Sequence, residues 1–283
     1  MEKEVKGYDL NININNFNLS YDDVGEGNVP VIFLHGFPFD RMMWRSQLDF
    51  FKSAYRLIAF DIRGFGKSND GKGEFSIDLF GDDLVAFMDR MDIPKAIVCG
   101  LSMGGYIALN VQQRFPERIE ALILADTQCI ADTAEAKEKR YKAIEEIEAQ
   151  GDAQFKEGFI KNVFAPNSLA GKKEVVEQLK MVVNATPQDS IIKGLKALAE
   201  RRETCLGLNK ITIPTLIICG KEDQLTPLAQ SEMMHMDING STLKVINDAG
   251  HVSNLEQPEV FNKYLQDFFS TLSAVNAANF NVD

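Results

Sequence analysis

Ser102 lies in the stretch GLSMG, residues 100–104, between an apolar run typical of a buried strand and a run typical of a helix. In that context G-x-S-x-G forms a sharp turn that lifts the serine hydroxyl clear of the sheet, and glycines are needed where neighbouring backbone leaves no room for a β-carbon. The backbone amide of Met103, at the helix start, can then help to hold an oxyanion. The pattern predicts that Ser102 is a nucleophile.

A base must accompany this serine, because a serine hydroxyl is a weak nucleophile until its proton is removed. His251 lies in a loop between the last strand-like run and the last helical run. That position puts its ring at the carboxyl end of the predicted sheet, where it can reach Ser102. His35 directly follows a buried strand and is interpreted as a structural residue that braces its loop. His235 falls inside an apparent helix.

The histidine in turn needs a carboxylate, which fixes its tautomer and stabilises its cation. Glu222 and Asp223 come just after a strand-like run, and Asp223 is favoured because Pro227 and the following helix imply a turn toward the ligand end. Asp126, at the end of an earlier strand, is the alternative acid; otherwise it would cap or brace its loop. The sequence therefore predicts a triad of Ser102, Asp223 and His251.

Strands and helices alternate along most of the chain and must position these side chains. Continuous apolar strands that alternate with helices indicate a parallel sheet covered on both faces. The opening stretch LNININNFNLSYDDVG alternates polar and apolar residues and predicts one or two antiparallel edge strands. The expected buried strands lie in the stretches VPVIFLHG, YRLIAFDI, KAIVCG, IEALILAD, IPTLIICG and STLKVIND.

The alternation stops at residue 127, and no strand-like run appears before about residue 209. The last helical segment of this stretch begins with Thr186 as a candidate N-cap and Pro187 at the first helical position. We therefore expect one α/β core, residues 1–126 and 210–273, interrupted by an all-helical segment, residues 127–209. Residues 274–283 show little patterning and are predicted to be a disordered tail.

Composition narrows the classes of function. The formal charge of −11 disfavours binding to nucleic acids and to anionic membrane surfaces. No signal peptide and no membrane-spanning run is recognisable. The four cysteines contain no C-x-x-C pair, Cys99 and Cys219 lie in strand-like runs, and none of the three histidines has zinc-type spacing. We expect a reduced, cytoplasmic protein without a metal or cofactor, either a monomer or a homodimer.

Five segments in one order resemble the α/β-hydrolase fold along nearly the whole chain. The segments are FLHGFP, FDIRGFGKS, GLSMGG, GKEDQLTP and AGH, and the order Ser, Asp, His is the one this fold uses. The resemblance implies a mostly parallel central sheet flanked by helices, with the helical segment as a cap over the site. It also implies that the backbone amides of Phe37 and Met103 form an oxyanion hole, and that Asp61, Arg63 and Gly64 brace loops.

A serine at this turn sets the chain apart from haloalkane dehalogenases and epoxide hydrolases, which use aspartate there. Both ends of the cap are similar to 3-oxoadipate enol-lactonase-like carboxylesterases. This resemblance implies hydrolysis of a small carboxylic ester or lactone through an acyl-enzyme. Alternatives are a cofactor-free perhydrolase, although Phe37 stands where those enzymes commonly have tryptophan, a C–C hydrolase, and a capped receptor for a small molecule with little turnover.

Apolar residues of the cap and the neighbouring loops are candidates for the substrate pocket. Arg140, Arg201 and Arg202 belong to the cap, and we interpret them as a solvated helix surface, with a clamp for a substrate carboxylate as the alternative. The residues expected to line the pocket are Trp44, Leu101, Phe159, Phe164, Leu225 and Val252.

Overall fold

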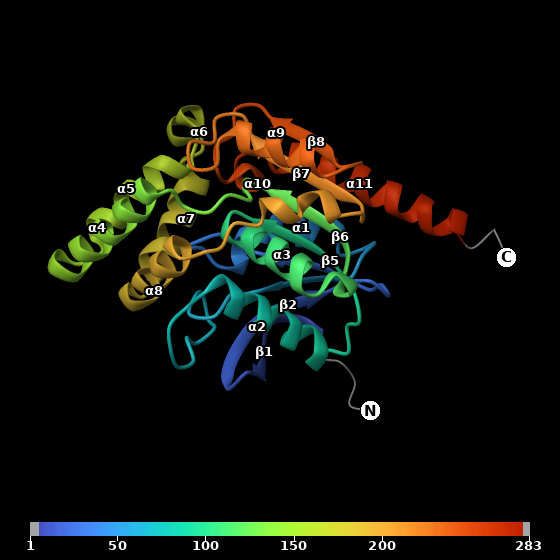
Figure 1. Cartoon of the computed structure of the whole chain (residues 1–283), viewed down its shortest axis with the longest axis horizontal. Coiled ribbons are helices and arrows are strands. Elements are labelled where there is room, and N and C mark those ends of the chain that lie inside the picture. The colour runs from blue at the N-terminus through green and yellow to red at the C-terminus, as the bar shows by residue number, and fades with distance from the viewer. Residues whose placement is uncertain (1–5, 280–283) are drawn as a thin grey trace.

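An eight-stranded sheet forms the centre of the molecule (Figure 1). The computed structural model describes residues 6–279, and side chains up to residue 272. The strand order is β1-β2-β4-β3-β5-β6-β7-β8; β1 and β2 form an antiparallel hairpin, β2 pairs antiparallel with β4, and the other pairs are parallel. The strands are β1 (Gly7–Ile14), β2 (Phe17–Val24), β3 (Val31–Leu34), β4 (Leu57–Phe60), β5 (Ala96–Leu101), β6 (Ile119–Ala125), β7 (Thr215–Gly220) and β8 (Thr242–Ile246).

The inner strands are buried on both faces, as their unbroken apolar runs predict. Every residue of β3, β4, β5 and β7 is buried. Successive side chains point to opposite faces, so in β3 Ile32 joins one apolar core and Phe33 the other. Helices α2 and α3 contribute to the first core, and α1 and α11 to the second. The core helices are α1 (Arg45–Phe51), α2 (Ile77–Arg90), α3 (Met103–Arg114), α9 (Leu228–Asp237), α10 (Ser253–Glu256) and α11 (Pro258–Asn279).

Between β6 and β7 the chain forms helices and no strand. This insertion stands at one side of the sheet, away from the C-terminal end of α11 (Figure 1). Within it α4 packs against α8, and α5 packs against α7. Its helices are α4 (Ala134–Gln150), α5 (Ala153–Val163), α6 (Pro166–Gly171), α7 (Lys173–Ala185) and α8 (Gln188–Ala199).

Two helix ends differ from the sequence analysis. Helix α8 begins after Pro187, and the hydroxyl of Thr186 donates to the backbone oxygens of Pro38 and Val182 instead of capping that helix. Helix α11 continues to Asn279, into the segment predicted to be a disordered tail. Residues 280–283 lie outside the described part of the chain, as do residues 1–5. The predicted domain boundaries remain an interpretation.

A disulfide joins Cys129, just after β6, to Cys205, just before β7. The expectation of a fully reduced protein is wrong for this pair. Their separation of 76 residues gives no spacing signal, because only the fold brings the two ends of the insertion together. Cys99 and Cys219 are free and buried, as predicted. Disulfides are uncommon in reducing compartments, so the bond counts against the predicted cytoplasmic location, which stays a prediction.

Among residues 6–279, no helix combines the length and the apolar character needed to cross a lipid bilayer.

The disulfide should stabilise the folded state by restricting the unfolded chain. A loop of this length is expected to contribute about 4 kcal/mol to the free energy of unfolding. We expect the double variant Cys129→Ser, Cys205→Ser to lose most of that stability in urea denaturation followed by circular dichroism. Dithiothreitol should lower the stability of the wild type to the same level and leave the double variant unchanged. Equal stability of the oxidised wild type and the variant would contradict the prediction.

Candidate active site

Ser102, Asp223 and His251 meet at one edge of the sheet. They follow β5, β7 and β8 respectively, and parallel strands present their carboxyl ends on the same edge. The Nε2 atom of His251 lies 2.8 Å from the Oγ of Ser102, and its Nδ1 lies 2.8 Å from Oδ2 of Asp223. The structure thus brings together the three residues that the sequence predicts for a triad.

Ser102 sits on a strained turn between β5 and α3. Its backbone angles are φ 53° and ψ −116°, a conformation that side-chain-bearing residues rarely adopt. Close contacts explain the flanking glycines. A β-carbon on Gly100 would lie 2.2 Å from the carbonyl oxygen of Gly104, and one on Gly104 would lie 2.2 Å from that of Leu34. Only glycine allows α3 to start so close to the sheet, which fixes the position of the serine hydroxyl.

The Asp223 carboxylate is held by its own loop before it meets the histidine. The backbone amides of Leu225 and Thr226 donate to Oδ1, at 2.8 and 3.0 Å, and the Thr226 hydroxyl donates to Oδ2 at 2.7 Å. An ionised carboxylate can only accept hydrogen bonds, so His251 carries its proton on Nδ1. Its Nε2 is then left as an acceptor for the hydroxyl of Ser102.

Burial and neighbouring charge shift the pKa values of His251 and Asp223 in opposite directions. Burial alone would lower the pKa of His251, but the neighbouring Asp223 carboxylate outweighs it and raises that pKa above 6.5. Burial would raise the pKa of Asp223, whereas His251 and the donors of Thr226 hold it below its ordinary value. The pair therefore favours a charged carboxylate beside an imidazole that accepts a proton readily.

The backbone amides of Phe37 and Met103 are the predicted oxyanion donors. Met103 is the first residue of α3, and Phe37 lies in the loop after β3. Within the described part of the chain neither N–H group has a hydrogen-bond acceptor. Unpaired N–H groups at a helix start favour negative charge. Their assignment as an oxyanion hole remains a proposal.

The ring of Phe37 is packed between the core and the insertion. It lies edge-on to Phe65 and Phe159, with ring centres 5.9 and 6.0 Å apart. A β-carbon on Gly194 of α8 would lie 2.6 Å from this ring. The glycine therefore makes room for Phe37 and so helps to position its backbone amide.

Asp126, the alternative acid in the sequence analysis, braces the site instead of contacting the imidazole. Its Oδ1 accepts from the amide of Gly220 at 2.8 Å, and its Oδ2 accepts from the hydroxyl of Ser253 at 2.6 Å. These bonds tie the end of β7 to the start of α10, on either side of the His251 loop. Burial raises the pKa of Asp126 to about 7, and the nearby carboxylate of Asp223 adds to the rise.

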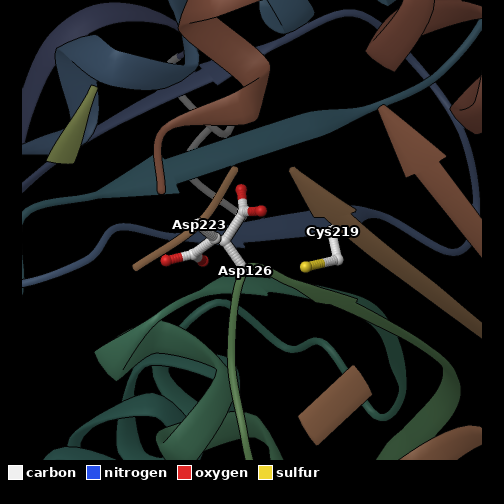
Figure 2. A group of neighbouring side chains, drawn as sticks. All are labelled: Asp126, Cys219 and Asp223. Carbon is white, nitrogen blue, oxygen red and sulfur yellow. The ribbon is translucent and has the colours of Figure 1, made fainter. Parts of the chain in front are cut away.

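The carboxylates of Asp126 and Asp223 and the thiol of Cys219 form a buried group of possible metal ligands (Figure 2). Their ligand atoms lie within 4.8 Å of one another. However, all four carboxylate oxygens already accept hydrogen bonds from amides, hydroxyls or His251. A cation would have to displace these donors, so the group fits hydrogen-bonded bracing better than metal binding.

His35 and Asp61 hold neighbouring loops, as the sequence analysis expects. The Nε2 of His35 accepts from the amide of Ile62 at 2.9 Å, and burial lowers the pKa of His35 to about 4. Asp61 accepts from the amide of Arg41 at 2.8 Å and also contacts its guanidinium. Arg63 pairs with a buried carboxylate on α2, Asp83, and Gly64 has a φ of 81°. Within residues 6–279, none of these residues is a hydrogen-bond partner of Ser102.

Backbone contacts join the His251 loop to the insertion, and the sequence analysis missed them. The amide of His251 donates to the carbonyl of Val163 at 2.7 Å. The buried carboxylate of Glu256 accepts from the amides of Gly250 and Ala165, at 2.7 and 2.8 Å. A β-carbon on Gly250 would lie 2.7 Å from the Ala165 nitrogen. The only sequence signal is the glycine before the histidine, which does not reveal its distant partner.

A cavity of about 380 Å³ contains Ser102 and His251 and opens beneath the insertion. Phe159 and Leu225 line it, as predicted. Trp44, Leu101, Phe164 and Val252 do not: all four lie in the second apolar core, and Trp44 packs on the rings of Phe33 and Phe261. Apolar character alone does not separate a core side chain from a pocket side chain. The other lining residues are Phe37, Tyr106, Gln128, Asp132, Ala136, Lys139, Arg140, Ala143, Phe155, Leu195, Leu198 and Thr226.

The three arginines of the insertion differ in environment. Arg140 lines the cavity and donates to Asp132 at 2.5 Å. Arg201 is buried, donates to the same carboxylate at 2.6 Å and stacks on the ring of Tyr106. Arg202 is exposed. The interpretation as a solvated surface is therefore wrong for Arg201, and the charge of Arg140 is already shared with Asp132.

Comparisons with known proteins agree with this fold. Residues 29–258 match the family described as alpha/beta hydrolase fold. The chain therefore belongs to the α/β-hydrolase fold family. It is 33% identical to 3-oxoadipate enol-lactonase 2 of Acinetobacter baylyi, over 86% of this chain and 90% of the relative.

Solved structures show the same likeness. A thermophilic esterase from Thermogutta terrifontis superposes with a TM-score of 0.89 at 30% identity, over 93% of this chain and 99% of the other. The enol-lactonase of Burkholderia xenovorans LB400 gives a TM-score of 0.85 at 25% identity, over 92% and 100%. The chain is thus a hydrolase of this fold whose relatives include esterases and lactonases.

A methyl group on Gly194 should disturb the site through Phe37. We expect Gly194→Ala to lower kcat for a p-nitrophenyl ester by roughly tenfold or more, because the added carbon displaces the ring and shifts the amide, and one lost oxyanion donor costs on the order of 10²-fold. Gly171→Ala is the control, since a β-carbon at that position meets no atom within 4 Å. Equal activity of the two variants would contradict this role of Gly194.

Proposed function

We propose that the protein hydrolyses small carboxylic esters or lactones through an acyl-enzyme on Ser102. The observation that carries the proposal is the continuous series of hydrogen bonds from Ser102 through His251 to Asp223. Ser102 and His251 also line the cavity under the insertion. A serine that shares its proton with a neutral imidazole is the arrangement that acyl transfer requires.

The first step forms the acyl-enzyme. His251 accepts the hydroxyl proton on Nε2 as the oxygen of Ser102 bonds to the substrate carbonyl carbon. The carbonyl oxygen becomes an oxyanion beside the amides of Phe37 and Met103, where each donor contributes about 3 kcal/mol in comparable sites. Asp223 stabilises the imidazolium. The tetrahedral intermediate then collapses: the bond to the leaving alkoxide breaks, and His251 gives it the proton.

The second step releases the acid. His251, neutral again, accepts a proton from water as the water oxygen bonds to the acyl carbon. A second tetrahedral intermediate collapses, the bond to Ser102 breaks, and the imidazolium returns its proton to the serine oxygen. In a lactone the alkoxide and the acyl group belong to one molecule, so the same two steps yield a hydroxy acid.

The cavity and the relatives support this substrate class. A volume of about 380 Å³ is near the lower end of the range for small-molecule pockets. Its lining combines apolar and aromatic side chains with polar and charged ones, among them Gln128, Lys139 and Arg140, a composition that suits an ester or lactone with both apolar and polar parts. The named relatives that act on a lactone or an ester favour the same chemistry. A perhydrolase would use the same acyl-enzyme with hydrogen peroxide in place of water, and a receptor would show little turnover.

Ser102→Ala should abolish ester hydrolysis. We expect kcat to fall on the order of 10⁶-fold, because the remaining groups have no nucleophile to activate. A panel of p-nitrophenyl esters and an enol-lactone, assayed together with peracetic acid formation, separates hydrolysis from perhydrolysis. Ser270→Ala, on the exposed side of α11, is the control that should keep full activity. Near-normal hydrolysis by purified Ser102→Ala, or a single burst from the wild type, would end the proposal.

The pH dependence should follow His251. Only the neutral imidazole is a base, so kcat/KM should be full above the pKa of His251 and fall as the pH drops through it. Because Asp223 raises that pKa, the midpoint should lie above the ordinary 6.5. Asp223→Asn removes the stabilising charge, so the residual activity should show a lower midpoint. A flat profile between about pH 5 and 8 would contradict the role of His251.

A further inference from the structure

A second cavity, of about 300 Å³, lies between α4 and α5 beside the cavity of Ser102. The two cavities share Ala143, Phe155 and Phe159 as lining residues. We name this second space the arm cavity. Its lining residues are Ala143, Glu146, Ile147, Gln150, Gly151, Gln154, Phe155, Gly158, Phe159 and Asn162.

One face of α4 lines both cavities in succession. Lys139 and Arg140 border the cavity of Ser102, Ala143 borders both, and Glu146 and Ile147 border the arm cavity. Residues three and four positions apart lie on the same side of a helix. The two spaces therefore adjoin along this face of α4, with Ala143 in the lining of both.

Two aromatic rings of α5 stand at the boundary between the cavities. Phe155 and Phe159 stack with ring centres 5.9 Å apart, and both side chains are partly exposed. The ring of Phe37, whose backbone amide is one of the proposed oxyanion donors, has its centre 6.4 Å from that of Phe155 and 6.0 Å from that of Phe159. A chain that passes along these rings stays in contact with apolar surface from the serine to the arm cavity.

The packing of the insertion keeps this space open. Helix α4 packs against α8 and α5 against α7, so the groove between α4 and α5 is not filled by another helix. Gly158 faces the arm cavity from the middle of α5, and a β-carbon there would meet no atom within 4 Å. Glycine is unfavourable inside a helix, and here no packing contact requires it. The absence of a side chain at Gly158 leaves free space in the arm cavity.

The chemistry of the lining selects the kind of group that fits. The partly exposed rings of Phe155 and Phe159 supply apolar surface, while Gln150, Gln154 and Asn162 carry neutral carboxamides. Glu146 is the charged residue among the described residues that line the arm cavity. An anionic group would face this carboxylate with no cation of the lining to pair with. An uncharged chain avoids this repulsion.

We propose that the arm cavity binds a long uncharged arm of the substrate, an alkyl or similar neutral chain attached to the ester or lactone that Ser102 attacks. The proposal rests on the proposed function, because it assigns the far end of a substrate whose carbonyl lies at Ser102. It predicts a preference for substrates longer than the first cavity alone can hold.

Replacement of Gly158 by leucine tests this proposal. The new side chain fills the arm cavity, and leucine is the better helix former, so the variant should fold. Two series of substrates show whether the arm belongs to the acyl part or to the alcohol part of the ester. The first series varies the acyl chain, from p-nitrophenyl acetate to p-nitrophenyl dodecanoate. The second varies the alcohol, from methyl acetate to dodecyl acetate. In one series Gly158→Leu should lower the kcat/KM ratio of the longest to the shortest substrate by roughly tenfold, since each buried methylene contributes about fourfold.

A leucine at a second open position of the insertion is the matched control for Gly158→Leu. Gly171→Leu adds the same side chain at another open position of the insertion and should leave the ratio at the wild-type value. An unchanged ratio for Gly158→Leu in both series, with short esters still hydrolysed, would overturn the arm cavity and leave the proposed function intact. Failure of the wild type to turn over any ester would overturn both.

Discussion

The hydrogen bond between the buried His251 imidazole and Asp223 is the interaction on which the site depends. Both groups are almost fully removed from water, and a buried charge is costly unless a partner and further donors satisfy it. Here the carboxylate accepts from the imidazole, two amides and a hydroxyl. Because the amide and hydroxyl donors belong to the Asp223 loop itself, the carboxylate is held independently of the histidine, and His251 contacts it through Nδ1.

Buried carboxylates perform the same task around the site without entering the chemistry. Asp126 joins the end of β7 to the start of α10, Asp61 holds the loop that carries Arg41, and Glu256 holds the loop of His251 against the insertion. In each case the oxygens accept from backbone amides, which loops at the end of a parallel sheet leave without strand partners. Carboxylates thereby replace the hydrogen bonds that the sheet no longer provides.

The insertion is part of the site and not only a cover over it. Its residue Val163 accepts the backbone hydrogen bond of His251, its Phe159 packs on the ring of Phe37, and its Gly194 leaves room for that ring. The shape of the cavity and the position of the proposed base and oxyanion donors therefore depend on the same contacts. The disulfide between Cys129 and Cys205 joins the two chain segments that connect this insertion to the core, which limits how far they can separate.

Local patterns in the sequence determined the sheet and its covering helices, because unbroken apolar strands and the helices between them are encoded by neighbouring residues. They also pointed to Ser102, through the G-x-S-x-G turn, and to His251 and Asp223 as its candidate partners, with Asp126 left as the alternative acid. Tertiary structure decided what depends on distant partners: the pairing of Cys129 with Cys205, the burial of Arg201 and the bracing by Glu256. It also decided which apolar side chains line the cavity and which are buried in the core. Trp44 and Phe164 are as apolar as Phe159 and Leu225, and only the packing of the insertion on the sheet determines which of them meet open space.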